Sequence, residues 1–383
     1  METDITNVQS TPGGKKRLGL PFAASHVGPI GLEVSLQYVH MVQLHLQRGQ
    51  VRLRASASQP LPGSFEEMLK APEALSQVIK QCVKRGEFKG RKVITAMPST
   101  LTRVLSVNYE LSTGQTDEHA ISKLLHDRIG DELADFVVDF MPINHDRRVT
   151  ERAALIAMCR RESVNTFLDT LSQSGLQPTA MEIGPVAIKR LVDAIQHQHV
   201  NRSALIINCG RERSYLTLVA NQHLLSDDEI SFGESGVLER VCDELEVNLD
   251  IAQQLLLDAD FGSDKPSDNT YTLTEIIRPE LNALVKEIER GLIYATTESR
   301  GQQDTSVYLM GSLARWRGAD RLLSRLLNHP VKTIPDPLRP FIAKPDLATD
   351  PRSAARRSRE REVSGRPELA IAAGLALRDF HNA

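Results

Sequence analysis

Residues 30–40 read IGLEVSLQYVH, a short apolar strand that runs into a turn and then into a second strand. The alternation of apolar and polar residues continues beyond it, so residues 28–58 predict a three-stranded antiparallel meander. A turn that binds a nucleotide phosphate favours glycines, a small carboxylate and a cation, whereas this turn offers Glu33, Ser35 and His40. Two interpretations therefore stay open here, an altered phosphate loop and an ordinary β-hairpin.

The same plan restarts in the second half of the chain. Residues 204–232 read ALIINCGRERSYLTLVANQHLLSDDEISF, which again predicts an apolar strand, a glycine turn, an alternating strand, a polar turn and a third strand. Superposing Glu33 on Asn208 also places Ser35 on Gly210. A repeat of this length predicts two similar domains that each start with a β-meander, rather than a solenoid. The alternative is that the two meanders are unrelated, because such meanders are common.

The composition is that of a globular chain large enough for two domains. The 383 residues are 41% hydrophobic and 25% charged, and no run approaches the roughly 18 apolar residues that span a membrane. The net charge of −3 and the 4% aromatic content argue against nucleic-acid binding. The N-terminus lacks the apolar core of a signal peptide, and the four cysteines form no CxxC pair. We therefore expect a reduced, cytoplasmic protein without a cysteine metal site.

Helices and further strands are expected between and after the two meanders. Residues 64–86 predict one helix with Gly86 as its C-terminal cap, and Thr116 suits the N-cap of the next helix. Two strands are expected on either side of Pro98-Ser99. Further strands are predicted at 135–143, 151–159 and 306–312, further helices at 161–175, 184–198, 273–298 and 317–327, and a polar loop at 260–270. Residues 368–380, ELAIAAGLALRDF, are apolar on almost every side and predict a buried helix of about three turns.

Three pieces of the sequence stand in an order that resembles the actin/Hsp70/sugar-kinase ATPase fold. They are the hairpins at 30–44 and 205–219 and the strand-to-helix turn YLMGSLARWRGADRLL at 308–323. The resemblance implies an α/β fold class in which two βββαβα-type domains face each other across a cleft. It also implies that the two hairpins hold the phosphates of ATP and that the late glycine turn holds the adenosine.

Six further stretches, in order, resemble the PilM family of type IV pilus assembly proteins, which are relatives of the cell-division protein FtsA. They are VITAMPSTLTRVLSV, IGDELADFVVDFMPI, RRESVNTFLDTLSQSGLQPTAMEIGPVAIKRL, FGESGVLERVCDELEVNLDIAQQL, YLMGSLARWRGADRLLSRLLNHPVKTIPDPLRPF and LAIAAGLALRDF. The family implies a cytoplasmic scaffold that binds the N-terminal cytoplasmic peptide of a PilN-like inner-membrane protein. It would link this partner to the pilus motor ATPases and reach the inner membrane only through the partner, with self-association left open.

The resemblance also divides the chain. A first actin-like domain is expected over 18–202 with a small α+β subdomain inserted at about 93–183, and a second over 203–342 with a subdomain at about 231–300. A disordered tail is expected at 1–17, a disordered Arg-rich loop at 343–367, and a C-terminal helix at 368–383 that returns to the first domain. The peptide groove is expected between the first core subdomain and the inserted one. For the Arg-rich loop, contact with anionic lipid is the alternative to a solvated loop.

The nucleotide motifs depart from the family pattern. Glu33, Ser35 and His40 stand where the family has Asp, Gly and Lys, and Asn208 replaces Asp in the second hairpin. The adenosine turn keeps one glycine of three, Gly311. Residue by residue, the resemblance still implies nucleotide-binding roles for Glu33, Ser35, His40, Asn208, Gly210, Arg211, Ser214, Gly233, Glu234, Lys286, Glu287, Arg290, Gly311, Ser312 and Leu313. Glu33 is the weak candidate for a water-mediated magnesium ligand.

Each departure weakens the expected binding of ATP and magnesium. Asn208 removes a negative charge near the metal, His40 is mostly neutral near pH 7, and Ser35 adds a Cβ to a backbone that approaches phosphate. A residue that positions the attacking water is not evident, so no catalytic residue is predicted. The sequence therefore predicts a degenerate nucleotide site. The alternatives are an active ATPase of this fold and a GspL-like or FtsA-like membrane adaptor, although residues 368–383 lack the basic polar face of a membrane-binding tail.

Ordinary structural roles are the alternative for several of these residues. His40 on an alternating strand fits a surface position, and Trp316 fits packing rather than ligand stacking. Lys286, Glu287 and Arg290 fit a solvated helix face. The sequence holds no Walker A, GxSxG or HExxH motif, which argues against the enzyme classes that depend on them.

Overall fold

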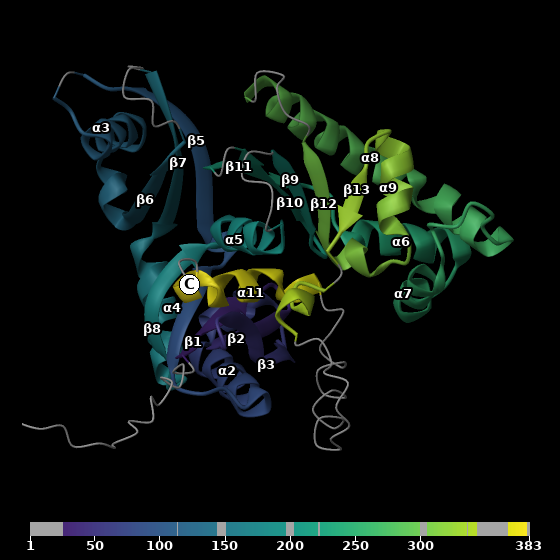
Figure 1. The fold of residues 1–383 in the computed structure, drawn as a ribbon, viewed down its shortest axis with the longest axis horizontal. Coiled ribbons are helices and arrows are strands. Elements are labelled where there is room, and N and C mark those ends of the chain that lie inside the picture. The colour runs from purple at the N-terminus through teal and green to yellow at the C-terminus, as the bar shows by residue number, and fades with distance from the viewer. Residues whose placement is uncertain are drawn as a thin grey trace, which may run out of the picture.

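The computed structural model describes residues 26–112, 114–143, 151–196, 203–220, 223–298, 305–334, 336–342 and 367–380. The chain forms two lobes, each built around a five-stranded sheet, and a small three-stranded sheet lies beside them (Figure 1). The tail predicted at 1–17 and all but the last residue of the loop predicted at 343–367 lie outside the described residues. Among the helices of the described part, none has the length and apolar character needed to cross a membrane.

The first sheet runs in the order β3-β2-β1-β4-β8. Its strands are β1 (His26–Val34), β2 (Tyr38–Gln47), β3 (Gln50–Pro60), β4 (Lys92–Met97) and β8 (Gln177–Ile183). The first three strands pair antiparallel in a register that places Glu33 opposite His40, whereas β4 and β8 run parallel to β1. The predicted meander is therefore confirmed. β8 was not predicted from the sequence, because its segment QPTAMEI carries a proline and no strict alternation.

The second sheet repeats this plan in the order β11-β10-β9-β12-β13. Its strands are β9 (Ala204–Cys209), β10 (Ser214–Ala220), β11 (His223–Ile230), β12 (Ser306–Gly311) and β13 (Val331–Thr333). Again the meander is antiparallel and the two later strands run parallel to its first strand. The two sheets thus share one strand order, and this confirms that the second meander is the counterpart of the first.

A third, smaller sheet has the order β5-β7-β6. It comprises β5 (Thr102–Glu110), β6 (Phe136–Pro142) and β7 (Glu151–Arg160), and α3 (Asp117–Ile129) packs on one of its faces. Thr116 caps α3 as predicted, because its side chain accepts a hydrogen bond from the His119 N–H. The small sheet occupies only the middle of the insertion predicted at 93–183, since β4 and β8 at either end pair within the first sheet.

Several predicted helix boundaries differ from those of the structure. Residues 64–86 form two helices, α1 (Phe65–Lys70) and α2 (Pro72–Gly86), because Pro72 cannot donate a backbone hydrogen bond to α1 and instead starts α2. The left-handed residue after α2 is Glu87, with a φ of 53°, rather than Gly86. α8 (Asp268–Glu298) begins inside the predicted polar loop and contains Pro279.

The other helices of the two lobes are α4 (Arg161–Gln173), α5 (Gly184–Gln196), α6 (Glu234–Leu245), α7 (Leu249–Asp258) and α9 (Ala319–Leu327).

The C-terminal helix α11 (Ala370–Ala376) lies between α5 and the first sheet (Figure 1). All of its residues except Ile371 are buried, so the predicted burial of this segment is confirmed. Its α-helical part has seven residues, shorter than the three turns predicted, and a 3-10 turn stands on either side of it.

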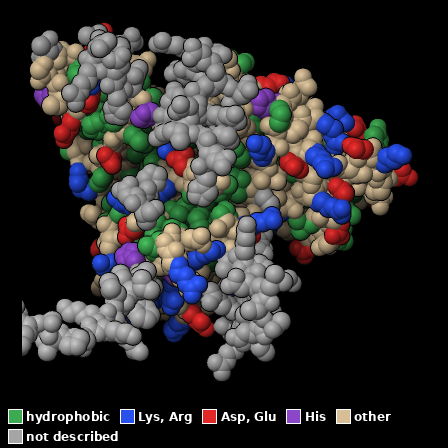
Figure 2. All heavy atoms as spheres, viewed as in Figure 1, with side chains coloured by type: hydrophobic (Ala, Val, Ile, Leu, Met, Phe, Trp, Pro, Cys, Tyr) green, Lys and Arg blue, Asp and Glu red, His purple; other side chains and the backbone are tan. Residues whose placement is uncertain are grey.

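On the face seen in Figure 2, acidic and basic side chains are intermixed over the second lobe, which is typical of a solvated surface.

Two glycines allow α11 to pack this closely. A Cβ on Gly31 of β1 would lie 2.1 Å from a backbone oxygen of α11, and a Cβ on Gly374 would lie 2.0 Å from the carbonyl oxygen of Ala187 in α5. Arg190 of α5 donates a hydrogen bond of 2.9 Å to the Gly374 carbonyl and pairs with Glu182 of β8 through both terminal nitrogens. The helix is therefore held by close backbone contact on two sides and by one buried ion pair.

Replacing Gly374 with alanine should destabilise the protein by about 1–3 kcal/mol, because the added methyl group meets backbone that cannot move aside. Urea unfolding followed by circular dichroism measures this. Gly236→Ala is the matched control, since the nearest atom to its Cβ would be 3.8 Å away, and it should change stability by less than about 1 kcal/mol. A Gly374→Ala protein as stable as the natural one would contradict this packing.

Candidate functional site

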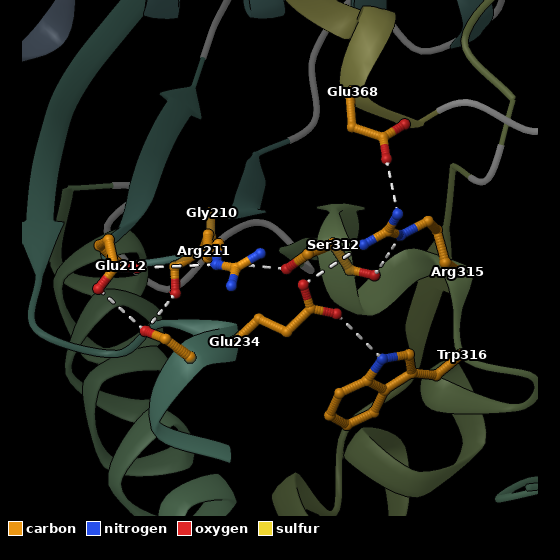
Figure 3. A network of polar contacts seen from close by, with 9 residues as sticks. Gly210, Arg211, Glu212, Glu234, Ser312, Arg315, Trp316 and Glu368 are labelled. Carbon is orange, nitrogen blue, oxygen red and sulfur yellow. Dashed lines mark hydrogen bonds and ion pairs between the residues drawn. The ribbon is translucent and has the colours of Figure 1, made fainter. Parts of the chain in front are cut away.

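Three of the segments predicted to hold a nucleotide meet in the second lobe (Figure 3). The Gly210 carbonyl, in the turn between β9 and β10, accepts a hydrogen bond of 3.3 Å from Ser312 Oγ. It accepts another of 3.1 Å from the N–H of Glu234. Ser312 follows β12 and Glu234 opens α6, so the hairpin turn, the end of the strand and the start of the helix are bonded into one unit.

The glycines of this unit are required by contacts of the chain with itself. Gly311 has a φ of 77°, and a Cβ on it would lie 2.0 Å from the carbonyl oxygen of Cys209. A Cβ on Gly233 would lie 2.4 Å from the carbonyl oxygen of Arg211, and Gly210 is crowded by the backbone of its own turn. The conformation of these three glycines is therefore explained without a bound phosphate.

The start of α6 bonds to the hairpin rather than to an external group. The N–H and the hydroxyl of Ser235 both donate to the Arg211 carbonyl at 2.8 Å, and the hydroxyl also lies 3.0 Å from Glu212 Oε2. A helix N-terminus binds anions through its free N–H groups. In α6 the N–H groups of Glu234 and Ser235 are already bonded to carbonyls of the turn.

A carboxylate of the chain itself stands at this helix start. The Glu234 side chain is buried, with Trp316 Nε1 at 3.3 Å from Oε1 and Arg315 Nη2 at 3.3 Å from Oε2. Trp316 is itself buried in the core of the second lobe, and its ring lies 5.6 Å from that of Phe261. The predicted packing role of Trp316 is confirmed. Glu234 thus supplies the negative charge that the positive end of the α6 dipole favours.

Arg315 extends the network to the segment that precedes α11 (Figure 3). Its Nη1 lies 3.2 Å from Glu368 Oε1, and its Nε donates to the Ser312 carbonyl at 3.4 Å. Neither Arg315 nor Glu368 was predicted as a site residue. The sequence offers no signal for the pair, because the two residues are far apart in the chain and each stands among other charged residues.

The turn of the first hairpin is closed by its own hydrogen bonds. The Ser35 N–H donates to the Tyr38 carbonyl at 2.8 Å, and Ser35 Oγ lies 3.1 Å from both the carbonyl oxygen and the nitrogen of Tyr38. The N–H and hydroxyl of Ser35 are therefore engaged inside the turn, as in an ordinary closed hairpin.

His40 does not lie on the surface, and that interpretation of it is wrong. The side chain is buried, its Nδ1 lies 2.8 Å from Ser58 Oγ of β3, and its ring stacks on that of Tyr38 at 5.5 Å. Helix α2 packs on one face of β2 and α11 on the other, so the alternation of this strand does not expose every second residue.

The Glu33 side chain is partly buried, at the end of β1. The pKa of its carboxyl is raised to about 8, chiefly by loss of solvent and then by the nearby charge of Glu368, and a hydrogen bond from the Ala372 N–H acts in the opposite direction. Among the described residues, its Oε2 atom is out of contact with solvent and has no hydrogen-bond partner. At pH 7 the carboxyl is therefore largely protonated, a poor state for holding magnesium-bound water.

The remaining predicted residues are spread over the second lobe. Asn208 lies in β9 between Tyr215 and Met310, the Ser214 hydroxyl donates to the Phe232 carbonyl at 2.8 Å, and Leu313 is buried in the core. Lys286, Glu287 and Arg290 lie on α8, where Arg290 is exposed and pairs with Glu287 at 2.9 Å. The polar contacts drawn in Figure 3 include none of these last three side chains.

A pocket of about 560 Å³ opens between the two hairpin turns. The first lobe lines it with residues 36–38 and 60–66, which are largely apolar, and the second lobe with Arg211 and Glu212. Arg211 brings a positive charge to this lining, and its Nε lies 3.8 Å from Glu212 Oε1. In the part of the chain that the structure describes, no three His, Cys, Asp or Glu residues are grouped so as to hold a metal ion.

Glu33 should make the stability of the protein depend on pH. The pKa of Glu33 in the folded state is above that of an ordinary glutamate. The protonated carboxyl therefore contributes its full stabilisation below about pH 4.5, and this stabilisation falls as pH rises toward 8. Glu33→Gln should therefore raise the unfolding free energy by about 1–3 kcal/mol at pH 9 and leave it nearly unchanged at pH 4.5. Urea unfolding at the two pH values measures the difference.

Glu66→Gln, at an exposed carboxyl, is the control for a general effect of removing a charge. The burial of Glu33 is contradicted if the Glu33→Gln protein keeps the pH dependence of the natural protein.

Known proteins resemble this chain over nearly its whole length. The sequence pattern of the family described as type IV pilus assembly protein PilM matches residues 31–380. A chain from a PilM-PilN type IV pilus biogenesis complex is 22% identical, with a TM-score of 0.71 over 92% of this chain and 98% of that one. The ethanolamine utilization protein EutJ from Carboxydothermus hydrogenoformans is 10% identical, with a TM-score of 0.51 over 92% of this chain and 89% of that one.

The likenesses in fold confirm the α/β class and the actin-like ATPase fold expected from the two hairpins and the late glycine turn. The two five-stranded sheets have the same strand order, as expected for a fold of two similar domains. Because the family pattern extends from β1 to the last described turn, the chain belongs to the PilM family of type IV pilus assembly proteins.

Proposed function

We propose that this protein is a scaffold for type IV pilus assembly that binds the N-terminal cytoplasmic peptide of a PilN-like inner-membrane protein. The observation that carries the proposal is the likeness, across both lobes, to a chain from a PilM-PilN complex. Membership of the PilM family supports the same role. In this role the protein lies on the cytoplasmic side of the inner membrane, reaches the membrane through its partner and links that partner to the pilus motor ATPases.

The peptide is proposed to bind in the groove between the first sheet and the three-stranded sheet. β5 and β6 are the edge strands of the small sheet, and an extended peptide can add to such an edge while its side chains enter pockets. Leu105 of β5 is 41% exposed, although it shares a sheet face with Val107, which is buried beneath α3. It lies near the first lobe, because only a short 3-10 turn separates β4 from β5. An exposed leucine at this place supports an apolar contact with the peptide.

Replacing Leu105 with glutamate should weaken binding of the partner peptide at least about tenfold, because it removes an apolar contact and adds a charge to the groove. Fluorescence anisotropy with a labelled peptide from the N-terminus of the partner measures the dissociation constant. Ile293→Glu is the control, because Ile293 is 68% exposed on α8 of the other lobe and its replacement should leave the affinity unchanged. Equal affinity of the Leu105→Glu protein and the natural protein would exclude this site, and an absence of binding to the natural protein would exclude the function.

We also propose that the nucleotide site is degenerate. This rests on the polar groups around the cleft, which are engaged within the chain: Ser35 with Tyr38, Ser312 with Gly210, and the start of α6 with the second hairpin. The protonated state of Glu33 near pH 7 removes the carboxylate expected to hold magnesium-bound water. Since the residues present do not fit Mg-ATP, no catalytic step is assigned to the protein.

Isothermal titration with Mg-ATP should accordingly show no binding at protein concentrations of tens of micromolar. The peptide titration on the same preparation establishes that the protein is folded and active in binding. Micromolar binding accompanied by phosphate release would contradict the degenerate site and favour the alternative, an active ATPase of this fold.

An FtsA-like membrane adaptor is less well supported. Such an adaptor needs an amphipathic tail that is free to enter a lipid surface. Residues 370–376 are instead packed as α11 between α5 and the first sheet, and Phe380 is buried beyond them. The described C-terminal segment is therefore part of the core of the protein.

A further inference from the structure

The two lobes are joined by an apolar layer around α11. One cluster of buried residues combines Val42 and Leu191 of the first lobe, Ile206 and Tyr308 of the second, and Ala372 of α11. Apolar contacts are non-directional, so a directional contact that crosses this layer would add to what fixes the angle between the lobes.

Arg315 makes such a contact. Its backbone is fixed to the second lobe, because it stands between Gly311, which is pressed against β9, and the buried Trp316. Its side chain reaches Glu368, in the 3-10 turn that leads directly into α11. α11 in turn packs against Gly31 and Ala187 of the first lobe. The ion pair therefore connects elements that belong to opposite sides of the cleft.

The three nitrogens of the Arg315 guanidinium contact three separate segments of the chain. Nε bonds to the carbonyl of Ser312 in its own turn, Nη2 lies 3.3 Å from Glu234 of α6, and Nη1 lies 3.2 Å from Glu368. This planar, multiply bonded arrangement cannot be reproduced by a single-headed cation such as lysine. The Glu234 side chain is only 6% exposed, and Arg315 and Glu368 are each about 30% exposed, so solvent screens these charges less than those of a surface pair.

We propose that Arg315 is a clamp between the lobes, an internal cation that holds the α11 segment against the second lobe without any bound ligand. Glu234, in the second lobe, pairs with the guanidinium and orients it. Glu368, in the turn that leads into α11, pairs with the guanidinium from the side of the first lobe. An anion that entered the cleft here would compete with both carboxylates for the same guanidinium. The clamp is separate from the peptide groove, so it holds or fails independently of the proposed function.

Hydrogen exchange measured by mass spectrometry tests the clamp in the full chain. Neutralising Glu368 with Glu368→Gln, or removing the cation with Arg315→Met, should raise exchange in α11 about fivefold. Exchange in β9, in the core of the second lobe, should stay unchanged, which separates opening of the clamp from global unfolding. The double variant should exchange no faster than the faster single variant, because both changes break the same contact.

Arg317→Met is the matched control. Arg317 stands two residues from Arg315, is mostly exposed and pairs with Asp260 of the same lobe at 3.2 Å, so its replacement should not alter exchange in α11. Glu368→Gln is the decisive variant, since Arg315→Met also leaves the buried Glu234 with one donor fewer. The clamp is refuted if Glu368→Gln leaves exchange in α11 at the natural rate, or if the two single effects add in the double variant.

Discussion

The fold depends on the close approach of α11 to the first sheet and to α5. This approach is possible only because Gly31 of β1 carries no Cβ where it meets the backbone of α11, and Gly374 of α11 carries none where it meets the backbone of α5. The small side chains of α11 allow the same segment to be buried on nearly all sides, and Arg190 fixes its position by bonding to the Gly374 carbonyl. Since the layer around α11 also contains residues of the second lobe, this one packing contact positions both halves of the molecule.

The chemistry of the cleft follows from this packing. The N–H of Glu234, at the start of α6, bonds to the Gly210 carbonyl of the chain. Arg315 pairs with the buried side chain of Glu234 at the place where the helix dipole favours an anion. The actin-like fold is thus retained while these polar groups bond within the chain, which is consistent with the proposed role in pilus assembly.

Much of the fold could be predicted because alternation and glycine turns are local signals. Both meanders and the cap at Thr116 were predicted from such signals, and burial of the C-terminal segment from its composition. β8 was missed because its segment carries a proline and no strict alternation. The site was less predictable, since the burial of His40 depends on tertiary packing around β2, and the pairing of Arg315 with Glu368 depends on how the two lobes meet.

In this PilM-family protein the polar groups around the cleft are proposed to be engaged by the chain itself rather than by a nucleotide. A crystal structure grown with a non-hydrolysable ATP analogue and magnesium at millimolar concentration tests it most directly. We expect Arg315 to stay bonded to Glu234 and Glu368 as in Figure 3, and the first hairpin to stay closed between Ser35 and Tyr38, with no nucleotide between the lobes. An analogue bound between the two hairpins, with Arg315 turned away from Glu368, would contradict it.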